Sequence, residues 1–461
     1  MAELPSTDLA EAIVGRALAN GGEFAELYAQ RGTGMAMSVD ESRIEGVGSG
    51  AEQGAGVRVV KDGTAYFAHV DGLAEADLLR AADEAAAALR GSRTEPLPLE
   101  ALATTPQEIR LRPGDVAAER KSDLLRTLDE RGRSQGEEIV QLQISYSEVR
   151  REIAVANSAG TYATDDRTRV RLGAQAVARR NGTVQTGFET LGGHRGFELL
   201  DGDPGRVAER AAKTALTLLD ADPAPAGSMP VVVAGGFGGV LFHEMTGHGL
   251  EADHVQKGAS VYEGKLGQVV AEPLVNAFDD GLLPGEWGTD AIDDEGTPAQ
   301  KTLVIEEGRL TSFLHDRRSA ERAGAEPTGN GRRASFAHLP IPRMTNTYIA
   351  PGDAEPEALI SEVKRGFYAV SFAGGQVEPA SGDFVFGVSE GYLIEGGKVT
   401  RPCRGATLIG NCVDALAAID AVGSDFEMKS GFCGKAGQRV PVGTGQGHVR
   451  IRELTVGGTE V

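Results

Sequence analysis

Two histidines that flank a glutamate, in the segment His243-Glu244-Met245-Thr246-Gly247-His248, set the strictest condition on how this chain folds. Paired imidazoles beside a carboxylate are typical of hydrolytic zinc sites, where the histidines hold the ion and the carboxylate takes a proton from the metal-bound water. In the common motif the histidines are four residues apart, but here they are five apart. Five residues of an ideal α-helix leave two side chains roughly 140° apart. We therefore expect a helix that is distorted, or that ends, between His243 and His248.

A single π-helical turn would bring the two histidines together, and such turns occur mostly at functional sites. Gly247 and Gly249 should lower the cost of the distortion, because glycine has wide conformational freedom. The alternative is two unrelated histidines beside a surface glutamate. The glycine-rich segment 235–239 matches neither G-x-G-x-x-G nor the Walker pattern. We interpret it as a flexible entry to the metal helix, or as a place where the backbone approaches a substrate closely.

Length, charge and cysteine content narrow the class of protein. A chain of 461 residues is long enough for two or three domains. Its 67 acidic and 46 basic residues give a net charge of -21, which argues against broad contact with nucleic acid or an anionic membrane. No run approaches the ~20 apolar residues of a membrane span, and the N-terminus does not resemble a signal peptide. Three cysteines fit a reducing compartment, so we expect a soluble, cytoplasmic protein.

The first half of the chain predicts helices that alternate with short strands. Apolar spacing and helix-stop residues predict four helices, near residues 9–18, 74–90, 116–128 and 206–219. The possible caps Ser6 and Thr7 precede the first of them. Turn residues predict a hairpin at residues 57–67 with an Asp-Gly turn, and a meander over about 138–189 with turns at 157–160 and 181–182. The second half is rich in glycine and short strands, with few long helices after the metal motif.

The clearest linker is residues 220–228, a run of Asp, Ala and Pro that ends in Gly and Ser. We therefore predict an N-terminal domain, residues 1–222, of mixed helices and antiparallel strands. A β-rich C-terminal domain, residues 229–461, would carry the metal helix. The predicted fold class is α+β.

A catalytic zinc usually has three protein ligands and a water, so a third ligand must be found. Three candidates follow His248 closely: Glu251, Asp253 and His254. Cys433 is another, because its flanking glycines suit a tight turn that presents the sulfur outward and nearby Lys435 would favour the thiolate. Cys403 and Cys412 are better explained as small buried hydrophobes. Chemistry alone leaves Cys433 and the group after His248 nearly level.

The chain resembles the TldD/PmbA family of metallopeptidases, and within it the TldD subunit. The resemblance covers most of the second half and, more loosely, the first. Besides residues 243–253, it rests on five segments in order: Asp293–Pro298, Thr328–Arg332, Arg343–Thr347, Gly374–Val377 and Cys433–Gln438. One departure is Cys412, where glycine is expected in relatives, which makes an alternative thiol ligand slightly more plausible.

Catalytic subunits of this family carry His-Glu-x-x-x-His and a cysteine near the C-terminus. The resemblance therefore implies His243, His248 and Cys433 as zinc ligands, with Glu244 as the general base. The other subunit, PmbA/TldE, lacks the metal motif. It is the implied partner, in a heterodimer or a larger pairing, and a homodimer is the alternative.

We predict a zinc-dependent peptidase that hydrolyses unfolded peptides or small precursor proteins, with Glu244 activating a zinc-bound water. His315, Arg332 and Arg343 are candidates for binding substrate and stabilising the oxyanion, although either arginine could instead form a surface ion pair. The strands around 374–377 and 381–386 could offer an edge to an extended peptide, or could be ordinary paired strands.

Three alternatives to this function and cofactor are disfavoured by the sequence. Relatives have been described as modulators of DNA gyrase, which suggests a non-catalytic binding protein, but the net charge of -21 disfavours direct contact with DNA. A serine hydrolase would need a G-x-S-x-G elbow, which the sequence lacks. Iron or manganese could replace zinc, although a thiolate ligand favours zinc.

Overall fold

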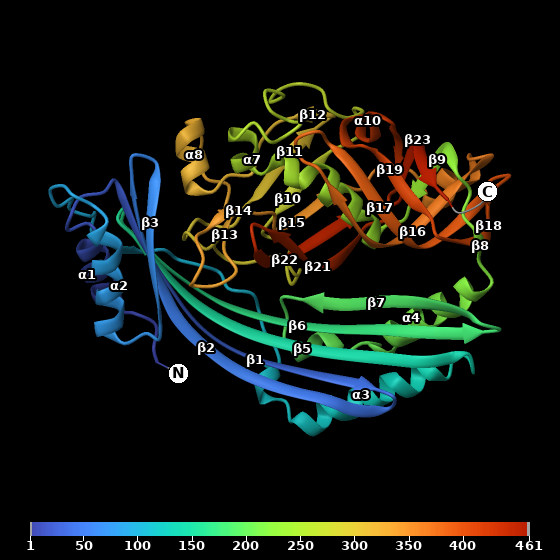
Figure 1. Ribbon diagram of the computed structural model, residues 1–461, viewed down its shortest axis with the longest axis horizontal. Coiled ribbons are helices and arrows are strands. Elements are labelled where there is room, and N and C mark those ends of the chain that lie inside the picture. The colour runs from blue at the N-terminus through green and yellow to red at the C-terminus, as the bar shows by residue number, and fades with distance from the viewer. Residues whose placement is uncertain (1, 459–461) are drawn as a thin grey trace.

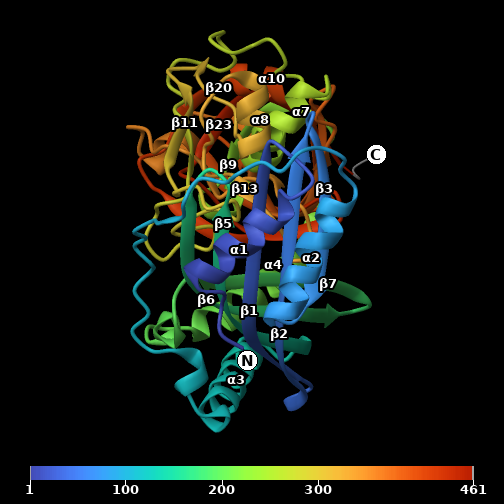
Figure 2. The same ribbon diagram turned by 90° about the vertical axis from the view of Figure 1, so that its left-hand side faces the viewer.

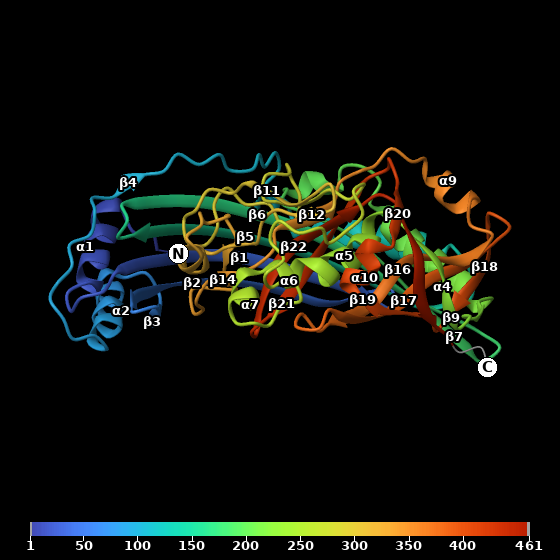
Figure 3. The same cartoon turned by 90° about the horizontal axis from the view of Figure 1, so that it is seen from above.

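The computed structural model describes residues 2–458, which form two layers (Figure 1). One layer is a long curved sheet from the N-terminal half of the chain. The C-terminal half lies on the concave side of that sheet, and the view from above shows it over the long strands (Figure 3). No helix within residues 2–458 is long and apolar enough to cross a membrane.

Seven strands form the N-terminal sheet, in the order β3-β2-β1-β5-β6-β4, with β7 paired to β6. Their bounds are β1 (Phe24–Asp40), β2 (Arg43–Lys61), β3 (Thr64–Asp71), β4 (Glu100–Ala101), β5 (Ile139–Asn157), β6 (Thr161–Arg180) and β7 (Thr183–Gly193). Asp62, Gly63, Asn181 and Gly182 all have positive φ, as type I′ hairpin turns require. The predicted hairpin and meander are thereby confirmed, as parts of one sheet.

Two pairs of helices cover the convex face of this sheet (Figure 2). One pair, α1 and α2, packs near β2 and β3, and the other pair, α3 and α4, packs near β5, β6 and β7. The helices are α1 (Thr7–Ala17), α2 (Glu75–Ala87), α3 (Ala118–Arg133) and α4 (Gly205–Leu219), with short turns η1 (Pro113–Asp115) and η2 (Phe197–Leu200). Ser6 caps α1, since its hydroxyl accepts the Leu9 amide at 3.3 Å. All four predicted helices are present, although α3 runs five residues past its expected end.

Five strands of the C-terminal half close into a barrel, in the order β16-β9-β23-β19-β17, because β17 pairs back onto β16. Their bounds are β9 (Gly227–Val233), β16 (Arg365–Val377), β17 (Asp383–Glu395), β19 (Thr407–Asn411) and β23 (Val449–Gly457). Three short strands extend this sheet: β8 (Asp222–Pro223), β18 (Lys398–Arg404) and β20 (Ile419–Val422). Val231, Phe367, Phe386 and Ile451 from the barrel strands are buried in the largest apolar core.

A second sheet of this half has six strands, in the order β12-β11-β10-β15-β22-β21. Their bounds are β10 (Ala277–Asp280), β11 (Lys301–Glu306), β12 (Arg309–Leu310), β15 (Asn346–Ile349), β21 (Glu427–Lys435) and β22 (Gln438–Gln446). Two further strands, β13 (Gly331–Arg332) and β14 (Ile341–Pro342), pair with each other. The strand β21 is therefore at an edge of its sheet.

Helices of the C-terminal half are short, as predicted. They are η3 (Gly236–Gly238), α5 (Gly239–Phe242), η4 (His243–Gly247), α6 (His248–Leu250), α7 (Ala252–Gln256), α8 (Arg317–Ala323), α9 (Pro356–Ser361) and α10 (Cys412–Ala417). The first four of these follow one another without a break and carry the histidine motif.

Buried ion pairs join the two halves. Arg58 of β2 contacts Glu295 at 2.7 Å, and Arg167 of β6 contacts Asp294 at 2.6 Å. All four side chains are almost fully buried. Removing one partner of such a pair typically costs about 3–5 kcal/mol, because the other charge is left unpaired in a medium of low dielectric constant. These contacts fix how the C-terminal half sits on the sheet.

The α+β class is confirmed, but the expected linker is not a free connection. Residues 222–223 form β8, which pairs with β18, and Gly227 already belongs to β9. The segment is therefore part of the barrel sheet. The division into domains 1–222 and 229–461 stays a prediction.

Candidate metal centre

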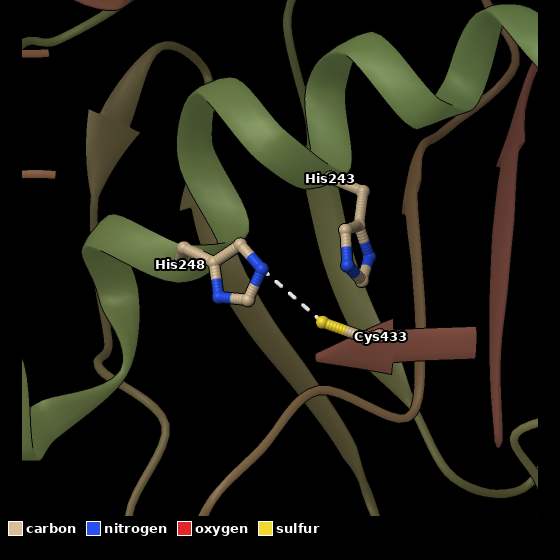
Figure 4. A group of neighbouring side chains, drawn as sticks. All are labelled: His243, His248 and Cys433. Atoms are coloured by element: carbon tan, nitrogen blue, oxygen red, sulfur yellow. Dashed lines mark hydrogen bonds between the residues drawn. The ribbon is translucent and has the colours of Figure 1, made fainter. Parts of the chain in front are cut away.

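The predicted distortion of the helix lies between the two histidines. The chain leaves β9, passes the glycine-rich segment and enters α5, and a π-helical turn, η4, then spans His243–Gly247 before α6 begins at His248. The extra residue of the π turn places both side chains on one side of the helix. Their ring centroids are 5.4 Å apart (Figure 4).

The two glycines of the motif have a different role from the one expected. Gly247 has an ordinary helical conformation, with φ −54° and ψ −49°, and Gly249 has no positive φ. A Cβ added to Gly247 would overlap the Met344 sulfur, and one added to Gly249 would lie 2.7 Å from the Tyr262 ring. Close packing, and not conformational freedom, is what requires glycine at these two positions.

Cys433, on the edge strand β21, completes a cluster with the two histidines. The ligand atoms of His243, His248 and Cys433 all lie within 4.8 Å of one another, and all three residues are buried. The Cys433 sulfur is 3.1 Å from Nε2 of His248 (Figure 4). Cys433 lies within the strand and faces inward, so the expected tight turn with an outward sulfur is wrong. The turn comes later, where Ala436 and Gly437 have positive φ.

The pKa values of His248 and Cys433 are both shifted within this cluster. Burial favours neutral imidazole at His248, but Glu251 and the Cys433 thiol raise its pKa well above the ordinary value. Burial also favours the neutral thiol of Cys433, but His243 and His248 lower its pKa well below the ordinary value. The histidines therefore favour the thiolate, in place of the Lys435 that was expected to do so.

The donor set fits a zinc ion. A thiolate and two imidazoles are ligands that zinc binds in tetrahedral sites. Within residues 2–458, Nδ1 of His243 is buried and has no hydrogen-bond partner. A buried polar atom left in this way costs free energy unless another group completes it. A metal ion bound at this nitrogen would supply the missing partner.

Glu251 lies behind the cluster and touches the other nitrogen of His248. Its carboxylate is 2.9 Å from Nδ1 of His248, 3.1 Å from Nζ of Lys435 and 3.5 Å from Nε of Arg343. Burial favours the protonated carboxyl of Glu251, but His248, Lys435 and Arg343 lower its pKa to about 2. A carboxylate on the far nitrogen of a ligating histidine fixes the orientation of the ring. The sequence suggested Glu251 only as a ligand, although its position three residues after His248 also fits this supporting role.

The other two alternative ligands are occupied elsewhere. Asp253 pairs with Lys435 at 2.5 Å and with Lys257 at 3.3 Å. His254 directs Nδ1 toward the backbone oxygen of His248, at 3.2 Å. In the part of the chain that the structure describes, neither belongs to the cluster, which favours Cys433 as the third ligand.

Glu244 is beside the cluster and less buried than the ligands. Its carboxylate lies 3.7 Å from Nε2 of His248, and a quarter of the side chain is exposed. A carboxylate in this position can accept a proton near the ion and still reach solvent.

The three candidate substrate-binding residues lie outside the cluster and are buried. His315 has Nδ1 3.2 Å from the Ser319 hydroxyl, and Arg332 donates to the backbone oxygens of Met344 and Pro441. Burial is the main reason that the pKa of Arg332 falls to about 10. Arg343 donates to the backbone oxygen of Gln438 and reaches the site only through Glu251. Their role in binding substrate stays a prediction.

Comparison with known families gives three matches along the chain. The family descriptions are "PmbA/TldA metallopeptidase domain 1" over residues 25–89, "central domain" over 111–219 and "C-terminal domain" over 226–458. The last of these contains all three residues of the cluster.

Individual proteins are similar over two thirds or nearly all of the chain. A metalloprotease TldD homolog of Haemophilus influenzae is 39% identical over 449 residues, which cover 95% of this chain and 93% of that protein. A zinc metalloprotease TldD homolog of Saccharolobus solfataricus is 33% identical over 307 residues, covering 64% and 68%. Among solved structures, TldE from Thermococcus kodakarensis superposes with a TM-score of 0.79 at 19% identity, covering 98% of this chain and 100% of that one. At this identity the TldE structure shows the fold alone.

Proposed function

Because the chain belongs to the PmbA/TldD family and is a metallopeptidase, we propose that it is a zinc-dependent peptidase that hydrolyses unfolded peptides or small precursor proteins. The observation that carries the proposal is the π-helical turn, which brings His243 and His248 within reach of Cys433. The name of the Saccharolobus relative supports zinc as the metal. So does the thiolate, which zinc binds more readily than harder ions do.

His243, His248 and Cys433 would hold the ion. When bound, zinc supplies a positive charge that polarises a peptide carbonyl and acidifies water. Glu251 keeps Nδ1 of His248 engaged, so that Nε2 points at the cluster. Lys435 and Arg343 in turn hold Glu251 ionised.

Glu244 acts as the general base. It takes a proton from the attacking water and delivers it to the leaving amine, and its position between the ligand His248 and solvent supports both transfers. Replacing Glu244 by Gln should therefore retain zinc and abolish cleavage of a peptide, because the amide cannot accept the proton. Normal turnover by this variant would contradict the assignment.

One edge of the strand β16 could accept an extended peptide. Residues 374–377 of β16 pair with β17, whereas the neighbour on the other side, β9, ends opposite Ala369. Beyond Ala369, one edge of β16 is therefore open among the described residues. Strand addition reads backbone more than side chains, which suits unfolded substrates of varied sequence. Because Arg332 and Arg343 are buried, any contact with substrate would require them to move.

A PmbA/TldE-like subunit is the partner we propose, with a homodimer as the alternative. The common fold with TldE makes the two chains compatible in architecture. We further propose a cytoplasmic location, because three cysteines in 461 residues fit a reducing compartment. We also propose that the chain does not bind nucleic acid directly, since its net charge is -21. Size-exclusion chromatography of the chain, alone and with a TldE-type protein, would test the pairing.

A further inference from the structure

A polar cavity of about 330 Å³ lies at the start of the metal-bearing helix. Its walls come from β7 and α4 of the N-terminal half and from the glycine-rich segment, β16 and β21 of the C-terminal half. Figure 1 shows β7 and α4 beneath β21 and β16 at this place. The volume is within the range of ligand sites, about 300–1,000 Å³. No residue of the candidate metal centre lines this cavity.

Negative charge and aromatic rings dominate the cavity wall. It contains four carboxylates, those of Glu189, Glu390, Asp425 and Glu427. It contains two cationic side chains, and both are already paired: Arg210 with Glu390 at 2.9 Å, and Lys429 with Glu427 at 2.9 Å. Three aromatic side chains complete the wall: Phe188, Phe237 and Tyr368. Four carboxylates against two cationic side chains favour a positively charged ligand, and the half-exposed Phe188 ring can contact such a ligand as well.

Asp425 is held in a fixed orientation at this wall. It accepts from Nδ1 of His448 at 2.9 Å and from the His448 amide at 3.0 Å. Nε2 of His448 in turn accepts from the Tyr368 hydroxyl at 2.8 Å. About a third of the Asp425 side chain remains exposed, so the carboxylate is positioned and still accessible.

The cavity and the metal centre lie along the same face of the strand β21. Alternate residues of a strand face the same side, so Lys429, Gly431 and Cys433 lie in one row. At one end of the row, Lys429 lies 5.2 Å from the centre of the Phe237 ring, and at the other end Cys433 meets His243. Four residues of strand separate the two ends by about 13 Å, which an extended peptide also spans in four residues.

Gly431 lies between the two ends, in the strand β21, and has room for a side chain. It is partly exposed, and a Cβ added there would come no closer than 3.8 Å to another atom. Packing within the chain therefore does not require glycine at this position. A larger side chain would stand in the row between the cavity and the metal centre.

We propose that this cavity is a substrate subsite, which binds a positively charged group about four residues from the bond that is cut. The group is a Lys or Arg side chain, or the free amino terminus of the peptide, because all three offer the same charge. This inference rests on the proposed peptidase function. The subsite would give the enzyme a preference for positive charge, in addition to recognition of the peptide backbone.

Synthetic peptides of twelve residues would test the subsite. Each peptide carries one Lys at a different position of a neutral sequence, and a control peptide carries Gln at the same position. Each pair is made with a free and with an acetylated amino terminus, which separates the two sources of charge. Cleavage is measured as kcat/KM. Binding is measured by fluorescence anisotropy with the Glu244→Gln protein, which needs no turnover.

We expect one positively charged position, about four residues from the cut, to raise kcat/KM and affinity about fivefold. The charge reversal Glu427→Lys should abolish that preference, because 59% of the Glu427 side chain is exposed and it can be replaced without disturbing the core. Glu357→Lys on exposed α9 is the matched control and should keep it. Gly431→Val should weaken the binding of long peptides. It should leave unchanged the binding of peptides that end within two residues of the cut.

Equal rates and affinities for charged and neutral peptides at every position would overturn the subsite. A preference for charged peptides that Glu427→Lys leaves unchanged would also overturn it. If the wild-type protein cuts no peptide while Glu244→Gln still binds the charged ones more tightly, the peptidase function fails and the subsite stands.

Discussion

Ion pairs of the same chemistry lie beside the two ends of the metal-bearing helix, in different surroundings. At the far end, Glu251 is paired with Lys435 and Arg343, and all three side chains are at least nine-tenths buried. At the near end, Lys429 is paired with Glu427, whose side chain is 59% exposed. The two groups of ion pairs therefore differ in burial and not in pairing. The buried one fixes a ligand, and the exposed one leaves a carboxylate free to exchange partners.

Magnitudes support this division. A buried charge that loses its partner costs about 3–5 kcal/mol, whereas exposed pairs contribute about 0–1 kcal/mol. A peptide with a positive charge can therefore compete with Lys429 for Glu427. No ligand of ordinary affinity would displace Lys435 from Glu251.

The largest effect should come from Glu251→Gln. The change removes the carboxylate that faces the buried Arg343, leaves Lys435 with Asp253 as its charged partner, and removes the anionic contact to the ring of His248. We expect a loss of about 3–5 kcal/mol in the free energy of unfolding and about 10–100-fold weaker zinc binding. Urea denaturation and zinc titration against a chelating dye would measure the two. Equal values for Glu251→Gln and Glu427→Gln would remove the distinction between the two ends.

Gly247→Ala should come next. Alanine is a better helix former than glycine by about 1 kcal/mol, so helix propensity alone predicts stabilisation. The added Cβ would overlap the Met344 sulfur, however, and overpacking costs about 1–3 kcal/mol. We expect net destabilisation and weaker zinc binding. Gly434→Ala, where an added Cβ meets nothing within 4 Å, is the control; a Gly247→Ala protein as stable as wild type would show that Met344 moves freely.

Acid should remove the contribution of Glu251 to the free energy of unfolding over a defined range of pH. The pKa of Glu251 is lowered from 4.5 to about 2, so this group stabilises the fold fully above about pH 4.5. The contribution is lost as the pH falls from about 4.5 toward 2. Urea denaturation at pH 5.5, 4.5 and 3.5 should show wild type losing more stability over this range than Glu251→Gln does. Parallel curves for the two proteins would argue against the shifted pKa.

The smallest effect should come from Glu427→Gln. Because most of its side chain is exposed, and Lys429 keeps Glu189 as a partner at 3.2 Å, we expect the free energy of unfolding to change by less than about 0.5 kcal/mol. Zinc content should equal that of wild type. A loss of zinc in this variant would mean that the near end also supports the metal centre.

Some of the site could be predicted from the sequence because the relevant geometry is local. Two histidines five residues apart cannot share a face of a regular helix, so the spacing predicts that the helix is distorted or ends between them. The structure shows which of the two occurs, a π turn over His243–Gly247. Cys433 is 185 positions from His248. Its place beside the histidines could be inferred only by resemblance, because the pairing of distant strands is not written in any local pattern.

The supporting role of Glu251 was missed for a related reason. Its backbone is extended, with φ −66° and ψ 116°, between α6 and α7, which turns the carboxylate back onto His248. The sequence shows a carboxylate near a ligand but not the direction in which it points. The barrel was missed likewise, since it depends on pairing such as Ile451 with Val231 across more than two hundred residues.

Zinc content tests the central claim most directly, measured on purified wild type, Cys433→Ser and, as a matched control, Cys412→Ser. Both cysteines are buried, but only Cys433 belongs to the cluster. We predict about one zinc per chain in wild type and in Cys412→Ser, and little in a Cys433→Ser protein whose circular dichroism is unchanged. Zinc retained by Cys433→Ser would contradict this account and return the third ligand to Glu251, Asp253 or His254. Absence of zinc from wild type after reconstitution would contradict the metal centre itself.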